Sequence, residues 1–309
     1  MKKDLLAILD LTGDEIVKIL DTADTLKAEQ KSGKPHDFPR GKVLAMIFEK
    51  NSTRTRVSFE TGIFQLGGHG IFLDSGSSQL GRGESIADTA RTLSRYCDCI
   101  MIRTFGHDIV KDLARYSTVP VINGLTDLAH PCQILGDLMT IREHKGKLNG
   151  LKVCYIGDSN NVANSLIAGA LKCGMKMSIA CPEHATPCVS VLNFAKSVPN
   201  ADFELTTDPR AAAKNADVIY TDVWASMGQE SEAAAREKLF AGYQVNDEIM
   251  ALANPKCMVQ HCLPAKKGKE ITEDVFEKHA DEIFDEAENR LHVQKAVMYL
   301  LMKGLLYDS

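Results

Sequence analysis

Strand-like and helix-like segments alternate along the whole chain of 309 residues. Val43–Phe48 is an uninterrupted apolar run, which is typical of a buried strand, and a helix is expected to follow it over 52–65 and to end at Gly67 and Gly68. A strand–helix–strand rhythm favours parallel sheets with right-handed crossovers. The expected fold class is therefore α/β.

The same rhythm predicts further elements on both sides of the polar break at 146–150. Strands are expected at 70–74, Cys99–Arg103, 119–122, 151–156, Lys176–Ala180, 203–205, 217–220 and Met258–His261. Helices are expected at 85–96, 108–116, 131–144, 161–173, 188–196, 209–215, 232–239 and, as one long amphipathic segment, 286–306. The break divides the chain into two similar halves, each with its own sheet and flanking helices.

Composition excludes several classes of protein. Hydrophobic residues make up 44% and charged residues 25% of the chain, as in ordinary globular proteins, and the net charge of −5 argues against a nucleic-acid binder. No apolar run approaches the ~18–20 residues that span a bilayer, and the first residues carry acids at Asp4, Asp10 and Asp14, unlike a signal peptide. We expect a cytoplasmic protein with no membrane and no nucleic-acid partner.

Nine cysteines, an odd number in a long chain, indicate unpaired thiols in a reducing compartment. The sequence contains no CxxC and no HExxH, and the adjacent His261 and Cys262 have no second ligand pair at metal-site spacing. No metal and no cofactor are expected.

The ligand of an open α/β sheet lies outside the carboxyl ends of its strands. Residues 52–56, Ser-Thr-Arg-Thr-Arg, stand at such a position and open a helix. Three hydroxyl groups, the unpaired amides of a helix start and two guanidinium groups make a trap for a phosphate, because basic residues at a helix N-terminus need an anion to offset the helix dipole.

Other strand ends carry polar side chains as well. They are Arg103, His130 and Gln133 in the first half, and the segments 157–161 (GDSNN), 222–228 (DVWASMG) and 261–264 (HCLP) in the second. His130 could polarise a carbonyl group, and the amides of GDSNN suit a carboxylate or zwitterion. GDSNN lacks the GxGxxG fingerprint, which counts against a nicotinamide-dependent oxidoreductase, the alternative that the two αβ halves suggest.

STRTR, HPCQ, DVWASMG and HCLP, in this order and at these spacings, resemble the aspartate/ornithine carbamoyltransferase family over essentially the whole chain. The SMG and HCLP segments point to its ornithine branch. The resemblance implies a carbamoyl-phosphate domain over 1–146, joined by a C-terminal helix at 287–309 that packs back on it, and an ornithine domain over 147–286. It also implies a homotrimer, or a multiple of trimers, with active sites between subunits.

The resemblance assigns roles to individual residues. Those implied for carbamoyl phosphate are Ser52, Thr53, Arg54, Thr55, Gln79, Arg103, His130, Gln133, Cys262, Leu263 and Arg290. Those implied for ornithine are Asn161, Asp222, Ser226 and Met227, and those implied for catalysis are Arg103, His130, Asp222 and Cys262. Gln79 would reach the site of a neighbouring subunit, and Arg82 is the candidate for a basic residue that some family members carry at the position of Gly83.

The implied reaction converts carbamoyl phosphate and L-ornithine to L-citrulline and phosphate, in arginine metabolism. Putrescine, N-acetylornithine or aspartate as acceptor, and a non-catalytic relative, are the alternatives that the sequence leaves to experiment. Whether the enzyme works in arginine synthesis or breakdown, and which group accepts the proton of the amine, also stay open.

Overall fold

The computed structural model describes residues 4–77, 79–225 and 230–307. The chain forms two compact units, Met1–Gly136 with Arg290–Ser309 (unit 1) and Asp137–Asn289 (unit 2). The divisions fall inside α5 (Pro131–Lys145) and inside α12 (Ala280–Met302), whereas the sequence placed them at 146/147 and 286/287. Each unit contains one parallel sheet flanked by helices, so the α/β prediction is confirmed.

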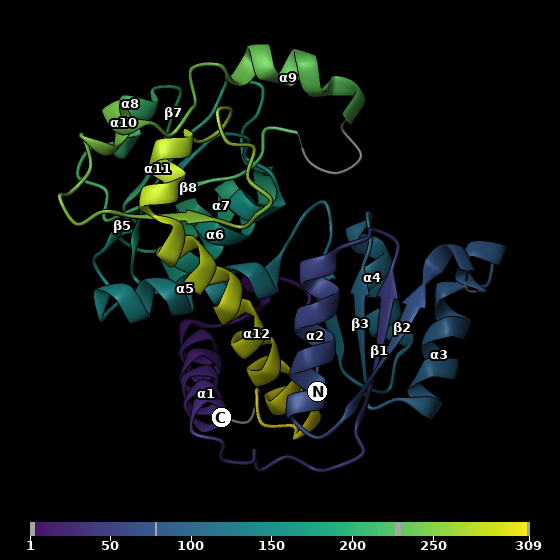
Figure 1. The fold of residues 1–309 in the computed structure, drawn as a ribbon. Coiled ribbons are helices and arrows are strands. Elements are labelled where there is room, and N and C mark those ends of the chain that lie inside the picture. The colour runs from purple at the N-terminus through teal and green to yellow at the C-terminus, as the bar shows by residue number, and fades with distance from the viewer. Residues whose placement is uncertain (1–3, 78, 226–229, 308–309) are drawn as a thin grey trace. The chain divides into compact units, whose positions relative to one another are not determined.

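The sheet of unit 1 has the order β2-β1-β3-β4 (Figure 1). Its strands are β1 (Val43–Phe48), β2 (His69–Asp74), β3 (Cys99–Arg103) and β4 (Val121–Leu125), all parallel. The chain leaves β1 toward β2 on one side and returns with β3 on the other, and the register pairs Phe48 with Arg103. The switch point of this sheet, where ligands bind in open α/β folds, therefore lies beyond the ends of β1 and β3.

Helices cover both faces of this sheet, because alternate side chains of a buried strand point to opposite faces. Ala45 and Ile47 pack in one apolar cluster with residues of α3 (Ile86–Tyr96) and α4 (His107–Tyr116). The other face carries α2 (Thr53–Gln65), which Figure 1 shows beside α12. A Cβ on Gly62 of α2 would lie 3.0 Å from the methyl group of Met298, so the two helices approach closely there.

The sheet of unit 2 has five parallel strands in the order β7-β6-β5-β8-β9. They are β5 (Lys152–Ile156), β6 (Lys176–Ala180), β7 (Phe203–Thr206), β8 (Val218–Thr221) and β9 (Met258–His261). The flanking helices are α6 (Asn161–Lys172), α7 (Val189–Ser197), α8 (Pro209–Ala213), α9 (Ala233–Phe240), α10 (Asp247–Met250) and α11 (Glu273–Lys278). Its switch point lies beyond the ends of β5 and β8.

The strands and most helices predicted from the sequence are confirmed within a few residues, but four helices differ from the prediction. The C-terminal helix begins at Ala280, six residues before the predicted start, and ends at Met302 before Gly304, whose φ is +70°. Three helices were not predicted: α1 (Gly13–Lys31), which Thr12 caps in a capping box with Glu15, and the short α10 and α11. None of the helices in the described part of the chain is long and apolar enough to cross a membrane.

Candidate active site

The start of α2 gathers cations around one hydroxyl group. Ser52 caps the helix by accepting the N–H of Thr55 at 3.2 Å, and Thr55 is fully buried. Nη2 of Arg290 lies 3.1 Å and Nη1 of Arg103 lies 3.4 Å from Oγ1 of Thr55, and both arginines are more than 90% buried. Two buried guanidinium groups at the positive end of a helix create a strongly positive local potential, so this cluster favours an anion.

The remaining residues predicted on this side lie in unit 1 as well. Burial, and then the charges of Arg290, Arg103 and Arg54, hold the pKa of His130 well below its usual range. His130 is therefore a neutral imidazole at neutral pH. It precedes Pro131, the first residue of α5, and Gln133 is buried in the first turn of that helix.

Arg290 is the member of this cluster that is remote in sequence. Alone, a charge on a long helix is more often solvated than buried, but Arg290 is 4% exposed and its Cγ would lie 3.1 Å from a Cβ on Gly136 of α5. The glycine thus leaves room for the arginine to reach Thr55.

Arg56 departs from the prediction that both arginines of the STRTR segment face the anion. Arg56, the second arginine of the STRTR segment, pairs with Glu60 of α2 at 3.1 Å, and its guanidinium group lies 3.9 Å from the ring centre of Phe72 on β2. It therefore stabilises the contact between α2 and β2. Gln79 is exposed and lines a cavity of about 120 Å³ with Leu73, Glu84 and other residues of unit 1. Thr53 is exposed at the first position of α2, and Arg54 is half-buried beside it.

In unit 2 the loops after β5 and β8 meet through an amide and a carboxylate. Asn160 caps α6, where its Oδ1 accepts the N–H groups of Val162 and Ala163, and its Nδ2 donates to Oδ2 of Asp222 at 2.7 Å. The turn before it needs Gly157, whose φ of +136° only glycine adopts readily. The prediction for ornithine named the neighbouring Asn161; the role of Asn160 as the cap that holds Asp222 comes from the structure, and its signal in the sequence was the cap position of an expected helix.

Asp222 is 5% exposed and is surrounded by donors. Its Oδ1 accepts the N–H of Val223 at 2.7 Å and the thiol of Cys262 at 3.0 Å. Burial and the neighbouring Asp222 raise the pKa of Cys262 well above its usual range, so Cys262 is present as a thiol and not as a thiolate.

His261 is buried behind Cys262 and fixes the next turn. Its Nδ1 accepts the N–H of Leu263 at 2.9 Å, so its Nε2 carries the proton and donates to Oε1 of the buried Glu270 at 3.2 Å. Leu263 takes a φ of +55°, which is uncommon for a residue with a side chain.

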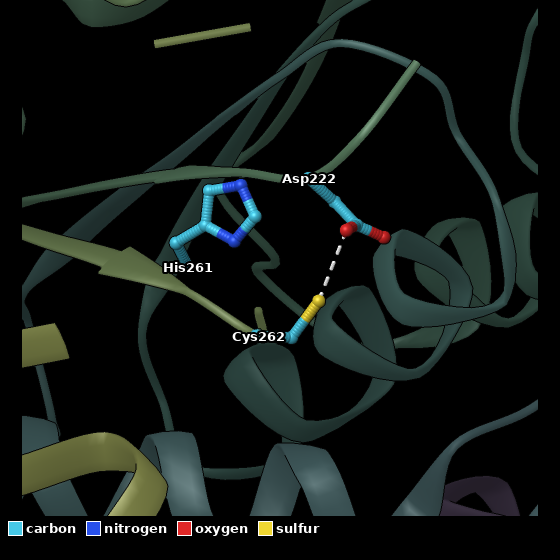
Figure 2. A group of neighbouring side chains, drawn as sticks. All are labelled: Asp222, His261 and Cys262. Atoms are coloured by element: carbon cyan, nitrogen blue, oxygen red, sulfur yellow. Dashed lines mark hydrogen bonds between the residues drawn. The ribbon is translucent and has the colours of Figure 1, made fainter. Parts of the chain in front are cut away.

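Figure 2 shows Asp222, His261 and Cys262 together. A carboxylate oxygen, a ring nitrogen and the thiol sulfur of these residues, each of which could bind a metal ion, lie within 4.8 Å of one another. Both ring nitrogens of His261 are already used in hydrogen bonds, and the thiol of Cys262 donates to Asp222. The three side chains are therefore held by hydrogen bonds within the protein. Ser226 and Met227, predicted for ornithine, lie outside the described residues.

Comparisons with known proteins cover nearly the whole chain. Residues 3–143 match the family model of the aspartate/ornithine carbamoyltransferase carbamoyl-P binding domain, and residues 149–301 match that of the Asp/Orn binding domain. The chain is 52% identical to the ornithine carbamoyltransferase of Geobacter metallireducens over 303 residues, which are 98% of this chain and 100% of the relative.

Solved structures agree with these sequence matches. The structure is similar to that of the ornithine carbamoyltransferase of Pyrococcus furiosus, with a TM-score of 0.93, 53% identity and coverage of 98% of this chain and 97% of the other. It is also similar to the anabolic ornithine carbamoyltransferase of Campylobacter jejuni, with a TM-score of 0.92, 42% identity and coverage of 98% and 100%.

Proposed function

The chain belongs to the aspartate/ornithine carbamoyltransferase family, and we propose that it transfers the carbamoyl group of carbamoyl phosphate to the side-chain amine of L-ornithine, giving L-citrulline and phosphate. The observation that carries this proposal is the convergence of Arg103 and Arg290 on the hydroxyl of Thr55 at the start of α2. Such a cluster favours a small ligand with a doubly charged phosphate and a carbonyl oxygen.

In unit 1 the phosphate group would lie at the start of α2. There the backbone amides, the hydroxyls of Ser52, Thr53 and Thr55 and the guanidinium groups of Arg54 and Arg103 can donate to its oxygens. The carbamoyl group would then face the side chains at the start of α5 and on α12. We assign its recognition to Thr55, Arg103, His130, Gln133 and Arg290, with Gln79 contributed by a neighbouring copy of the chain.

In unit 2 the amino-acid end of ornithine would lie at the loops after β5 and β8. The carboxylate of Asp222 suits an α-ammonium group and the amide of Asn161 suits an α-carboxylate; we assign Ser226 and Met227 to the same end. We assign Cys262 and the carbonyl of Leu263 to the reacting amine, close to the carbamoyl carbon.

The chemical step requires a neutral amine. An ammonium group with a pKa of ~10.4 costs roughly 4.6 kcal/mol to deprotonate at pH 7, which the site offsets by desolvation and by acceptors for the N–H groups. Cys262 enters as a thiol whose proton points to Asp222, so its sulfur lone pairs remain available to the amine.

The nitrogen of ornithine forms a bond to the carbamoyl carbon, and the carbon–oxygen bond to phosphate then breaks. Negative charge develops on the carbamoyl oxygen in between, and Arg103, Thr55, Arg290 and the neutral His130 can donate to it as an oxyanion hole. The phosphate leaves with the electron pair of the broken bond and can take the proton that the amine gives up.

The cellular setting is part of the proposal. All nine cysteines are unpaired, which supports the reducing cytoplasm. The ornithine carbamoyltransferases from Pyrococcus furiosus and Campylobacter jejuni, to which the chain is similar, are described as anabolic, which supports a role in arginine biosynthesis. The exposed side chain of Gln79, which lines a cavity of unit 1 and is free to reach a neighbouring copy of the chain, supports a homotrimer.

Citrulline formation by the purified chain tests the proposal. Carbamoyl phosphate is held constant while L-ornithine, putrescine, N-acetylornithine and L-aspartate are offered in turn. We expect product with L-ornithine only, and an Arg54→Ala variant should lose both turnover and stabilisation by phosphate in a thermal-shift assay. Equal turnover with putrescine would contradict the assignment of Asp222 to the amino-acid end.

A further inference from the structure

Arg236 on α9 joins two loops that come from different strands. Its Nε donates to the carbonyl oxygen of Trp224, in the loop after β8, and its Nη2 donates to the carboxylate of Asp158, in the loop after β5. The side chains of Arg236 and Asp158 are only 16% and 14% exposed. An ion pair this sheltered from water constrains its two partners more than a surface pair does.

Aromatic packing holds the guanidinium group in place. Arg236 lies 5.3 Å from the centre of the Phe240 ring, and Trp224 stacks on the same ring at 6.1 Å. Glu232, one turn earlier on the chain, reaches Arg236 only at 4.0 Å and is largely exposed. The loop after β8 is thus fixed to α9 through both the backbone and the ring of Trp224.

The two loops that Arg236 joins are those that carry the ornithine residues. Asp158 is two residues before Asn160, whose amide donates to Asp222, and Asp222 is two residues before Trp224. Tyr155 also supports this turn, because its hydroxyl donates to the carbonyl oxygen of Asp158 at 2.7 Å. A shift of either loop would therefore change the geometry between Asn160 and Asp222.

We propose that Arg236 and Asp158 form a positioning pair for ornithine recognition. They hold the loops after β5 and β8 in the relative positions that bind the amino-acid end of the substrate. This inference rests on the proposed function. Neither residue is assigned a contact with substrate, so neither is a catalytic residue.

The pair adds a pH dependence of its own. Burial raises the pKa of Asp158 to about 6, Arg236 opposes that rise and the nearby Asp222 adds to it. The ionisable groups near Asp158 are Arg236, Asp222, Tyr155 and Cys181, and Glu232 lies beyond Arg236. As the pH falls through about 6, Asp158 takes up a proton and the ion pair weakens, so the affinity for ornithine should fall over the same range.

Steady-state kinetics with four variants test the inference: Arg236→Gln, Arg236→Lys, Asp158→Asn and the double variant Asp158→Asn/Arg236→Gln. Arg210→Gln is the matched control, because Arg210 pairs with Glu248 at 2.9 Å in the same unit but both side chains are exposed. For the Gln and Asn variants we expect the KM for ornithine to rise about tenfold, equivalent to about 1.4 kcal/mol. The KM for carbamoyl phosphate and the control variant should stay within about twofold of wild type.

The pair should also show coupling and a pH signature. The double variant should match the worse single variant, because both remove one interaction, and Arg236→Lys should recover part of the loss. The ratio of KM for ornithine between Asp158→Asn and wild type should shrink toward one below pH about 6, where the wild-type carboxyl is itself protonated. A purely structural role would lower kcat, raise both KM values together and leave this ratio constant.

Three results would overturn the inference. They are an ornithine KM within about twofold of wild type in all single variants, additive effects in the double variant, or an equal loss of affinity for both substrates. If Arg236→Gln does not fold, Arg236→Lys and Asp158→Asn decide the matter with the same readouts. A wild-type chain that makes no citrulline would refute the proposed function first, which separates the two failures.

Discussion

In unit 1 the end of β3 and helix α12 bring two guanidinium groups to one buried hydroxyl, whereas in unit 2 the loops after β5 and β8 hold a carboxylate that is already surrounded by donors. Both sites occupy the same place in their sheets. The cations of unit 1 gather where α2 also presents its positive end, whereas Asp222 of unit 2 accepts hydrogen bonds from Asn160, Val223 and Cys262. The position of the site is thus a property of the fold, while its charge is a property of the few side chains that are brought to the ends of the strands.

The largest effect is expected in unit 1. Arg103→Gln removes a buried donor of the proposed oxyanion hole, so kcat/KM should fall about 10³-fold. Citrulline assays measure this loss, and stabilisation by carbamoyl phosphate in a thermal-shift assay should disappear with it. If carbamoyl phosphate still protects the variant fully, the cations of unit 1 are not its binding site.

A smaller effect is expected from Asp222→Asn in unit 2. The new amide would direct N–H groups at a site that already holds donors from Asn160, Val223 and Cys262, so kcat/KM for ornithine should fall about 50-fold. Protection by carbamoyl phosphate should be unchanged. An equal loss of affinity for ornithine and for carbamoyl phosphate would show that the two units do not bind separate substrates.

The pH dependence of turnover distinguishes the substrate amine from Cys262 as the titrating group. With wild type, kcat/KM should rise about tenfold per pH unit toward an alkaline plateau, because only the neutral amine reacts. Cys262→Ala should lower turnover about fivefold and leave the shape of the profile unchanged, because the thiol stays protonated. A flat wild-type profile from pH about 6 to about 9, or a changed shape in the variant, would contradict this account.

The smallest effect on activity concerns a cation in the core of unit 1. Burial lowers the pKa of Lys295 from 10.5 to about 8, and its Nζ lies 3.4 Å from Nε2 of His36. The folded state therefore binds the lysine proton more weakly than the unfolded state, so the free energy of unfolding should rise with pH between about 8 and 10.5.

Chemical denaturation of Lys295→Met measures this contribution. The variant should gain up to about 3 kcal/mol at pH 7 and lose the rise at alkaline pH, with citrulline formation close to that of wild type. Lys303→Met, one residue beyond the end of the same helix, is the control and should retain the rise. A destabilised Lys295→Met chain would show that the ammonium group and His36 stabilise unit 1.

Much of the fold and of the anion site in unit 1 could be predicted from local sequence patterns. The apolar run of β1, the polar segment after it and the cap at Ser52 are all short-range signals, so the strand, the helix and the anion site between them could be predicted together. The helix α1 was missed because its amphipathic pattern is weak and its capping box was overlooked in an acidic segment. Arg56 resembles Arg54 in sequence, but its position on the helix directs it to Glu60 and Phe72.

The sequence alone determined the α/β class, the strand ends where chemistry gathers and the residue types found there, because each depends on hydrophobic periodicity and on neighbours within a few positions. Only the tertiary structure decided that Arg290, 235 residues from Thr55, is buried against it, that Asn160 donates to Asp222, and that Arg236 joins Asp158 to Trp224. These contacts depend on how distant segments pack, and no local pattern encodes the direction in which a long polar side chain will find its partner.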